Sequence, residues 1–206
     1  MKSHPANLGK ISDLTVAHYN ERAEAFWEGT KDHDVGQNIA ALLQHIKADP
    51  PCKILDFGCG PGRDLKFFSQ LGHIAVGLEG AGRFVEMARS HSGCEVWHQD
   101  FLKLDLPDKY FDGVFANASL FHVPGSELPR VLKELWATLK PGGILFQFQP
   151  ARQRRGGLES GTLQRIPRYR KLETLHGRRG FRRSSPLLPP GGFATRTATV
   201  AGQRLA

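Results

Sequence analysis

Hydrophobic residues follow two spacings along the first 148 residues. Short, mostly apolar runs, of the kind found in strands buried on both faces of a sheet, occur at residues 54–57, 74–78, 94–97, 111–116 and 144–148. Between these runs, apolar residues recur every three or four positions, which is the spacing of amphipathic helices. The alternation of strand and helix predicts an α/β fold with a doubly wound, mainly parallel sheet and helices on both faces.

The helical spacing is clear enough to place five helices, at residues 13–27, 39–46, 65–71, 81–91 and 128–139. Pro50 and Pro51 stop the second helix before the first strand, and Ser126 is placed to cap the last helix. We therefore expect three regions: a flexible amino terminus at 1–12, one α/β domain at 13–148 and an atypical tail at 149–206.

A glycine-rich turn follows the first predicted strand. Gly58, Gly60 and Gly62 stand at alternate positions between this strand and a helix. Glycine permits a sharp turn there and leaves the backbone open to a ligand. A strand, a glycine loop and a helix form the opening unit of nucleotide-binding sheets, so the loop is a candidate cofactor site.

Two acids near this loop bear on the kind of cofactor. Glu79 ends the second strand, where a carboxylate can accept hydrogen bonds from ribose hydroxyls in either a dinucleotide or another nucleoside cofactor. The glycines do not have the Gly-x-Gly-x-x-Gly spacing of dinucleotide sites. Asp56 would repel a pyrophosphate and would favour a ligand that carries an ammonium group, directly or through a water. Asp56 and the glycine spacing together argue against NAD, whereas Glu79 does not decide between the two cofactor classes.

Five motifs follow one another along the chain: Asp56–Gly62, Glu79, Asp100-Phe101, Phe111–Val114 and Leu139–Gly143. Together they resemble the class I S-adenosylmethionine-dependent methyltransferases of the small-molecule type, over about residues 19–148. The resemblance implies a Rossmann-like sheet and S-adenosylmethionine as the methyl donor. It leaves the acceptor and the oligomeric state open.

The residues predicted to bind the cofactor are Tyr19, Asp56, Gly58, Cys59, Gly60, Gly62, Glu79, Asp100, Phe101 and Asn117. By the resemblance, Asp56 and the loop glycines line the methionyl end, and Glu79 holds the ribose hydroxyls. Asp100 accepts a hydrogen bond from the adenine amino group, with Phe101 beside the ring, and Tyr19 closes over the cofactor. Each acid also has a structural interpretation: Asp56 as a cap of the loop, Glu79 as a solvated strand end and Asp100 as a turn residue.

His122 is the candidate catalytic base. A sulfonium is already an activated methyl donor, so a methyltransferase has chiefly to align the acceptor and exclude water. An amine or hydroxyl acceptor can still require a base, whereas a thiolate does not. His122 follows the fourth strand at the carboxyl edge of the sheet, where ligands gather. A histidine packed beneath a loop is the alternative.

Cysteine content and hydropathy bear on the cellular setting. Cys52, Cys59 and Cys94 are odd in number and lack zinc-type spacing, so we expect free thiols, no disulfide and no metal. The chain has no run of about 18 apolar residues and no signal-peptide pattern, which predicts a cytoplasmic protein without a membrane span.

The net positive charge of the chain comes from the tail. The chain has a formal charge of +8, but residues 149–206 carry twelve Arg and one Lys against two Glu, a charge of +11, so residues 1–148 carry −3. An acidic body argues against a nucleic-acid acceptor. The Asn/Asp-Pro-Pro-Tyr/Phe clamp of amino-methylating enzymes is also absent, because Asn117 is followed by Ala118 and Ser119. A small-molecule acceptor is the remaining expectation.

The tail departs from the family pattern. The resemblance implies a helix and an antiparallel hairpin after the fifth strand, and the Arg/Gly/Pro-rich tail lacks their hydrophobic spacing. We hypothesise that the reading frame shifts between about Phe146 and Arg155. The hairpin would then be missing, and the fifth strand would be an exposed edge. A disordered, RNA-binding or anionic-surface extension is the alternative interpretation of the tail.

Two other functions stay open at this point. Glu79 is compatible with an NAD-dependent oxidoreductase. A non-catalytic module that binds S-adenosylmethionine and recruits a partner through its basic tail is the other alternative.

Overall fold

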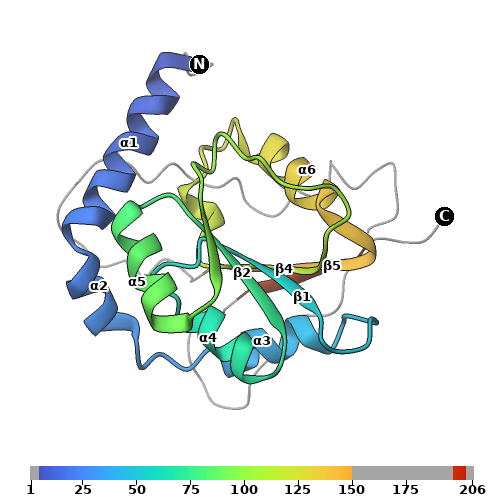
Figure 1. Cartoon of the computed structure of the whole chain (residues 1–206). Coiled ribbons are helices and arrows are strands. Elements are labelled where there is room, and N and C mark those ends of the chain that lie inside the picture. Colours follow the sequence, from blue (N-terminus) through green and yellow to red (C-terminus); the bar gives the residue numbers. More distant parts are fainter. Residues whose placement is uncertain (1–4, 150–196, 203–206) are drawn as a thin grey trace.

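A sheet of six strands runs through the residues that the computed structural model describes, 5–149 and 197–202 (Figure 1). The strands lie in the order β3-β2-β1-β4-β5-β6; β1 to β5 are parallel to their neighbours and β6 is antiparallel to β5. They are β1 (Lys53–Phe57), β2 (Ile74–Glu79), β3 (Glu95–His98), β4 (Phe111–Asn117), β5 (Leu139–Gln149) and β6 (Thr197–Gly202). The strand order reverses between β1 and β4, which is where sheets of this kind bind ligands.

Helices cover both faces of the sheet. They are α1 (Pro5–Glu21), α2 (Ala23–Thr30), α3 (Gly36–Leu43), α4 (Arg63–Gln70), α5 (Gly82–Ser92), the 3-10 helix η1 (Leu120–His122) and α6 (Leu128–Ala137). Residues of α3, α4 and α5 share one apolar core, and residues of α6 belong to a second core on the opposite face (Figure 1). The predicted doubly wound, mainly parallel fold is confirmed. In the part of the chain that the structure describes, no helix combines the length and the hydrophobicity that a membrane span requires.

β1 is buried because both of its edges are paired and both of its faces are covered. Ile54 pairs with Ala75 of β2 and with Gly113 of β4. The side chain of Ile54 belongs to the core of α3, α4 and α5, whereas that of Leu55 belongs to the core of α6. Covering both faces explains why an uninterrupted apolar run, rather than an alternating one, marks this strand.

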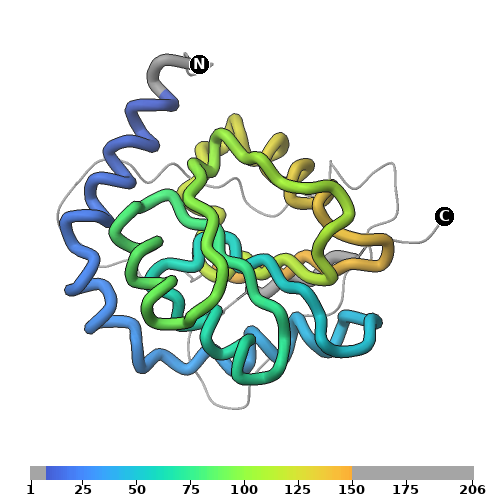
Figure 2. Tube along the Cα trace, viewed as in Figure 1, coloured from blue at the N-terminus to red at the C-terminus, as the bar shows by residue number. Residues whose placement is uncertain are grey.

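The amino-terminal helices differ from the prediction. Residues 5–12 lie in α1, so the expectation of a flexible amino terminus is wrong for them, and the single helix expected at 13–27 is divided between α1 and α2. Both helices lie beside α5, as the Cα trace in Figure 2 shows. Tyr19 of α1 and Ala23 of α2 pack against Phe84 of α5. This long-range packing is what places α1 and α2 over one end of the sheet.

The start of α6 also differs from the prediction. Its N-cap residue is Glu127, with no side-chain cap, so Ser126 does not have the predicted capping role. The backbone N–H groups of Glu127 and Leu128 instead donate to the carbonyl of Pro124, at 2.9 and 3.0 Å. Pro129 lies in the first turn, where its fixed φ suits a helix and its missing N–H costs nothing.

β5 is not an exposed edge, contrary to the prediction. β6 pairs with it in antiparallel register, with Phe146 opposite Val200 and Phe148 opposite Ala198. β6 contains two Thr and one Val, β-branched residues that are typical of strands. The tail sequence around it has no clear strand pattern. The hypotheses of a reading-frame shift and of a basic binding tail concern residues that lie, for the most part, outside the described ones.

Candidate active site

A cavity of about 330 Å³ lies at the carboxyl ends of β1, β2 and β4. Its walls come from α1 and α2, from the glycine loop and from the segments that follow β2, β3 and β4. The predicted site residues that line it are Tyr19, Gly58, Cys59, Gly60, Glu79, Asp100, Phe101, Asn117 and His122. Two predicted residues, Asp56 and Gly62, do not line it.

The glycine loop turns sharply and presents its backbone to the cavity. The N–H groups of Gly58 and Cys59 both donate to the carbonyl of Leu78 in β2, at 2.8 and 3.2 Å. Gly58 and Gly60 have φ values of 77° and 51°, which favour glycine. A Cβ atom at Gly58 would collide with Ser119, whereas one at Gly60 would reach only a ring atom of Phe26 at 3.8 Å. Gly60 therefore faces open space.

Gly62 has a different role from the one predicted. It is the N-cap residue of α4 with a φ of 91°. A Cβ atom there would lie 2.8 Å from the Cα atom of Ala88 in α5. Gly62 therefore permits the close approach of α4 to α5 rather than contact with a ligand.

Glu79 ties the end of β2 to the glycine loop. Its Oε2 atom accepts from the Gly60 N–H at 3.0 Å, and its Oε1 atom accepts from Gly80 and Ala81 at 2.8 and 2.9 Å. Glu79 is 9% exposed, so the alternative interpretation of Glu79 as a solvated strand end is wrong. Burial raises the pKa of Glu79, although the three backbone donors oppose this. The carboxylate lines the cavity and retains lone pairs for ligand hydroxyls.

Asp100 presents one oxygen atom to its own loop and to α1. Its Oδ1 atom accepts from the Leu102 N–H at 2.8 Å and from the Ser12 hydroxyl at 3.0 Å. Within residues 5–149, no hydrogen bond to Oδ2 is formed. Phe101 lies next to Asp100 and packs on Phe57, with the ring centroids 4.3 Å apart. Asp100 and Phe101 thus form one end of the cavity, with an acceptor beside an aromatic ring.

Asp56 lies beneath the glycine loop rather than on the cavity wall. It is 2% exposed, and its Oδ2 atom has no hydrogen-bond partner among the described residues. Burial raises the pKa of Asp56 well above its usual range, and the carboxylate of Asp64 raises it further. Ser119, which does line the cavity, has a buried hydroxyl that is also without a partner in the described part of the chain.

Sequence reasoning missed a polar network at this end of the cavity. Asp64 accepts from Arg63 Nε at 2.6 Å and from Asn117 Nδ2 at 2.9 Å. Asn117 in turn accepts from Asn38 Nδ2 at 3.0 Å, and Arg63 Nη1 donates to the Thr30 carbonyl at 2.8 Å. Arg63 and Asp64 directly follow Gly62 in sequence, and that position is the one signal that could have revealed them. The network joins the predicted residue Asn117 to three other elements.

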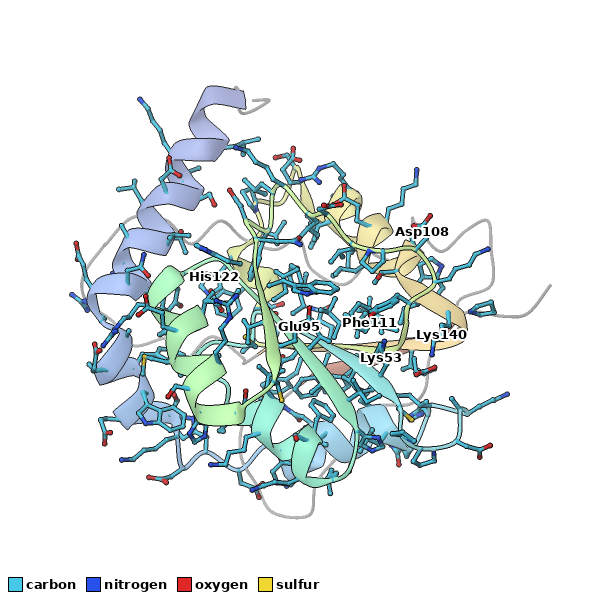
Figure 3. All side chains as sticks on the ribbon, in the orientation of Figure 1. Lys53, Glu95, Asp108, Phe111, His122 and Lys140 are labelled. Carbon is cyan, nitrogen blue, oxygen red and sulfur yellow. The ribbon has the colours of Figure 1, made fainter. Side chains whose placement is uncertain are left out.

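Five rings form an aromatic wall of the cavity: Tyr19, Phe26, Phe84, Phe121 and His122. Adjacent ring centroids are 4.1 to 5.6 Å apart. The Tyr19 hydroxyl is 3.1 Å from His122 Nε2, and burial lowers the pKa of His122 to about 4. His122, labelled in Figure 3, is therefore neutral at pH 7, and the wall carries no charge.

The three cysteines are not paired with one another. Cys52, Cys59 and Cys94 are free thiols, and burial raises the pKa of Cys59, the one that lines the cavity. Across the described ranges, no three His, Cys, Asp or Glu residues are grouped as metal ligands would be.

Comparison with known sequences identifies the domain. Residues 55–147 match the family model described as "Methyltransferase domain". Sterol 24-C-methyltransferase of Yarrowia lipolytica is 33% identical over 138 residues, which are 62% of this chain and 34% of that protein. Probable tRNA methyltransferase 9B of Mus musculus is 36% identical over 111 residues, which are 53% of this chain and 24% of that protein. The chain thus spans about a third or less of these two relatives.

Comparison with solved structures agrees with this match. The 1,6-didemethyltoxoflavin-N1-methyltransferase of Burkholderia thailandensis, solved with S-adenosylhomocysteine, has a TM-score of 0.71 at 19% identity and covers 99% of this chain and 92% of its own. The magnesium protoporphyrin IX methyltransferase of Synechocystis, solved with S-adenosylmethionine, has a TM-score of 0.67 at 18% identity, covering 94% and 97%. Residues 55–147 therefore match the methyltransferase domain family, and the chain has the Rossmann-like fold of these S-adenosylmethionine-dependent methyltransferases.

Proposed function

We propose that this chain transfers a methyl group from S-adenosylmethionine to a small-molecule acceptor. The observation that carries the proposal is the arrangement of two acids at separate points of one cavity. Glu79 is held there by three backbone donors, and Asp100 keeps one carboxylate oxygen without a partner among the described residues. These positions suit the ribose hydroxyls and the amino group of adenine.

Other features of the cavity fit the remaining parts of the cofactor. The open space at Gly60 leaves room for a ligand to lie against the loop backbone. The unpartnered oxygen of buried Asp56 is the kind of group that a cationic ligand would compensate, so it suits the methionyl ammonium group through Ser119 or a water. When bound, S-adenosylmethionine supplies an activated methyl group, so the protein has to orient the acceptor and exclude water.

The uncharged aromatic wall supports a small acceptor. Tyr19, Phe26, Phe84 and Phe121 offer apolar ring surface, which favours planar or apolar molecules over phosphate-bearing ones. The relatives include sterol methyltransferases and a probable tRNA methyltransferase. The charge of −3 on residues 1–148 disfavours RNA, because nucleic-acid binding depends on positive charge. A small apolar acceptor fits the described residues better than a tRNA does.

His122 is the proposed proton acceptor when the substrate atom carries a proton. The Tyr19 hydroxyl, 3.1 Å from Nε2, orients the ring, and the neutral imidazole has a lone pair to accept a proton. A pKa of about 4 keeps the imidazole in the neutral form that can accept a proton at pH 7, and it makes the imidazole a weak base.

The direct test uses donor labelled in its methyl group. We expect the full chain to place the label in a small-molecule extract and not in a tRNA pool. His122→Gln should reduce kcat by tenfold or more, as loss of a general base does, with little change in the affinity for S-adenosylhomocysteine. Label that enters tRNA alone would contradict the acceptor class, and unchanged kcat would reassign His122 to packing.

The proposed roles of Asp56 and Asp100 can be separated by comparing two ligands. Asp56→Asn should weaken binding of S-adenosylhomocysteine by about tenfold or more, because a charged partner of the ammonium group is lost. It should leave binding of 5′-methylthioadenosine, which lacks that group, unchanged. Asp100→Asn is the matched control and should weaken both ligands, because both contain adenine. Calorimetric titration measures each constant, and equal effects of Asp56→Asn on the two ligands would refute its assignment.

The buried state of His122 predicts a pH dependence of stability. The unfolded chain binds a proton near pH 6.5, whereas the folded chain binds it only near pH 4. The free energy of unfolding of the wild type, relative to His122→Gln, should therefore fall as pH decreases from 6.5 to 4, by up to about 3 kcal/mol. Urea unfolding at several pH values measures this difference. A difference that is constant with pH would show that His122 is not buried in its neutral form.

A further inference from the structure

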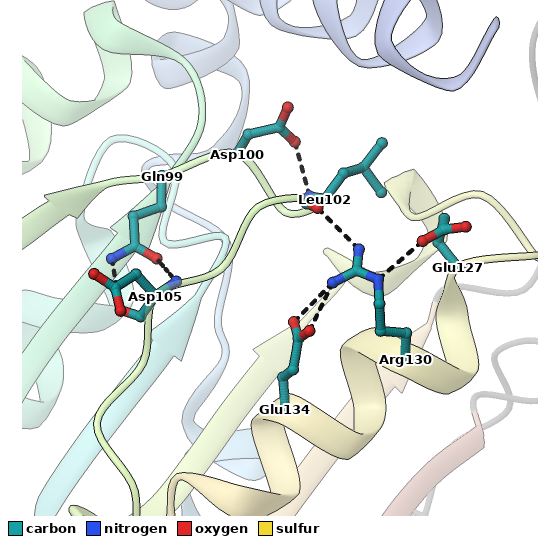
Figure 4. A network of polar contacts seen from close by, with 7 residues as sticks. All are labelled: Gln99, Asp100, Leu102, Asp105, Glu127, Arg130 and Glu134. Atoms are coloured by element: carbon teal, nitrogen blue, oxygen red, sulfur yellow. Dashed lines mark hydrogen bonds and ion pairs between the residues drawn. The ribbon is translucent and has the colours of Figure 1, made fainter. Parts of the chain in front are cut away.

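Arg130 of α6 connects this helix to the loop that carries Asp100. Its Nη2 atom donates to the carbonyl of Leu102 at 2.9 Å (Figure 4). The same residue, Leu102, donates its N–H to Asp100 Oδ1 at 2.8 Å. Leu102 thus accepts a hydrogen bond from Arg130 at its carbonyl and donates one to Asp100 from its amide.

Two glutamates fix the orientation of the Arg130 guanidinium. Glu127 accepts from Nε at 2.9 Å, and Glu134 accepts from Nη1 at 2.7 and 2.9 Å. These residues stand one turn before and one turn after Arg130 on α6, and Figure 4 shows the guanidinium between them. Because the guanidinium is planar, binding Nε and Nη1 directs Nη2 toward the loop. The side chain is 38% exposed, so its role is geometric rather than a large contribution to stability.

The base of the loop is braced separately. The Gln99 side chain donates to the Asp105 carbonyl at 3.0 Å and accepts from the Asp105 N–H at 2.9 Å. This pair closes the loop at its two ends (Figure 4). The part of the loop with Asp100 and Leu102 lines the cavity; Leu102 packs against the apolar core of α6, and Arg130 adds a hydrogen bond from α6 to its backbone. Removing Arg130 would therefore loosen this part while the base stays closed.

We propose that Arg130 is a positioning residue for adenine recognition. By holding Leu102, it keeps Asp100 oriented so that Oδ2 accepts a hydrogen bond from the exocyclic amino group of adenine. It thereby helps the site select an aminopurine over a purine that carries an oxygen at that position. This inference rests on the proposed function, because it takes S-adenosylmethionine to be the ligand.

The test compares S-adenosylhomocysteine with S-inosylhomocysteine, in which a carbonyl oxygen replaces the amino group and the adjacent ring nitrogen carries a proton, by calorimetry on the full chain. The wild type should prefer S-adenosylhomocysteine by about tenfold or more, because a hydrogen bond to a carboxylate is lost in the inosine analogue. Arg130→Gln should reduce this preference by about threefold or more. It should change the affinity for S-inosylhomocysteine by less than about twofold, because that ligand has no amino group to donate to the oriented oxygen.

Two further variants keep the test specific. Arg130→Lys keeps the charge and one donor but lacks the planar fork, and should give an intermediate preference. Arg83→Gln is the matched control, because Arg83 of α5 also pairs with two glutamates, Glu24 and Glu86, and does not line the cavity. It should leave the preference unchanged.

The outcomes are distinguishable. An unchanged preference in folded Arg130→Gln, or equal weakening of both ligands, would overturn the positioning role while leaving the proposed function intact. If Arg130→Gln does not fold, Arg130→Lys decides in the same way. A wild type that binds neither ligand would contradict the proposed function itself, and this inference with it.

Discussion

The carboxylate of Glu79 is the interaction on which the site depends. It accepts from the backbone of the glycine loop and from the first residues after β2, so one buried side chain joins the glycine loop, β2 and the start of α5. The start of this loop is bonded to the Leu78 carbonyl of β2, and Glu79 adds the bond that fixes its tip at Gly60. The burial that raises the pKa of Glu79 also keeps the carboxylate in one orientation at the edge of the cavity.

The buried acids of the site lower the stability of the fold and suit a cationic ligand. Asp56 is a buried acid whose pKa is raised by burial and by the nearby Asp64 carboxylate, and it has an oxygen without a partner in the described part of the chain. Such an arrangement lowers stability unless a cation compensates it. The opposite wall is aromatic and neutral. A ligand with a cationic amino-acid end, a nucleoside and a transferable group is complementary to both.

Local patterns predicted the strands and the acids at their ends, because apolar runs such as Ile54–Phe57 depend only on burial on both faces, and parallel strands bring their carboxyl ends together. Contacts between distant residues were not predictable. Ser12 binds Asp100 across 88 positions, and no local signal links them. For the same reason, the helical state of residues 5–12 and the pairing of β6 with β5 were missed, and Asp56 was placed on the cavity wall instead of beneath the loop.

The central claim is that this cavity binds S-adenosylmethionine and its product rather than a dinucleotide. Calorimetric titration of the full chain with S-adenosylhomocysteine, and separately with NAD, tests it most directly. The account predicts saturable binding of S-adenosylhomocysteine with one site per chain and no measurable heat with NAD. Tight binding of NAD with no response to S-adenosylhomocysteine would contradict it.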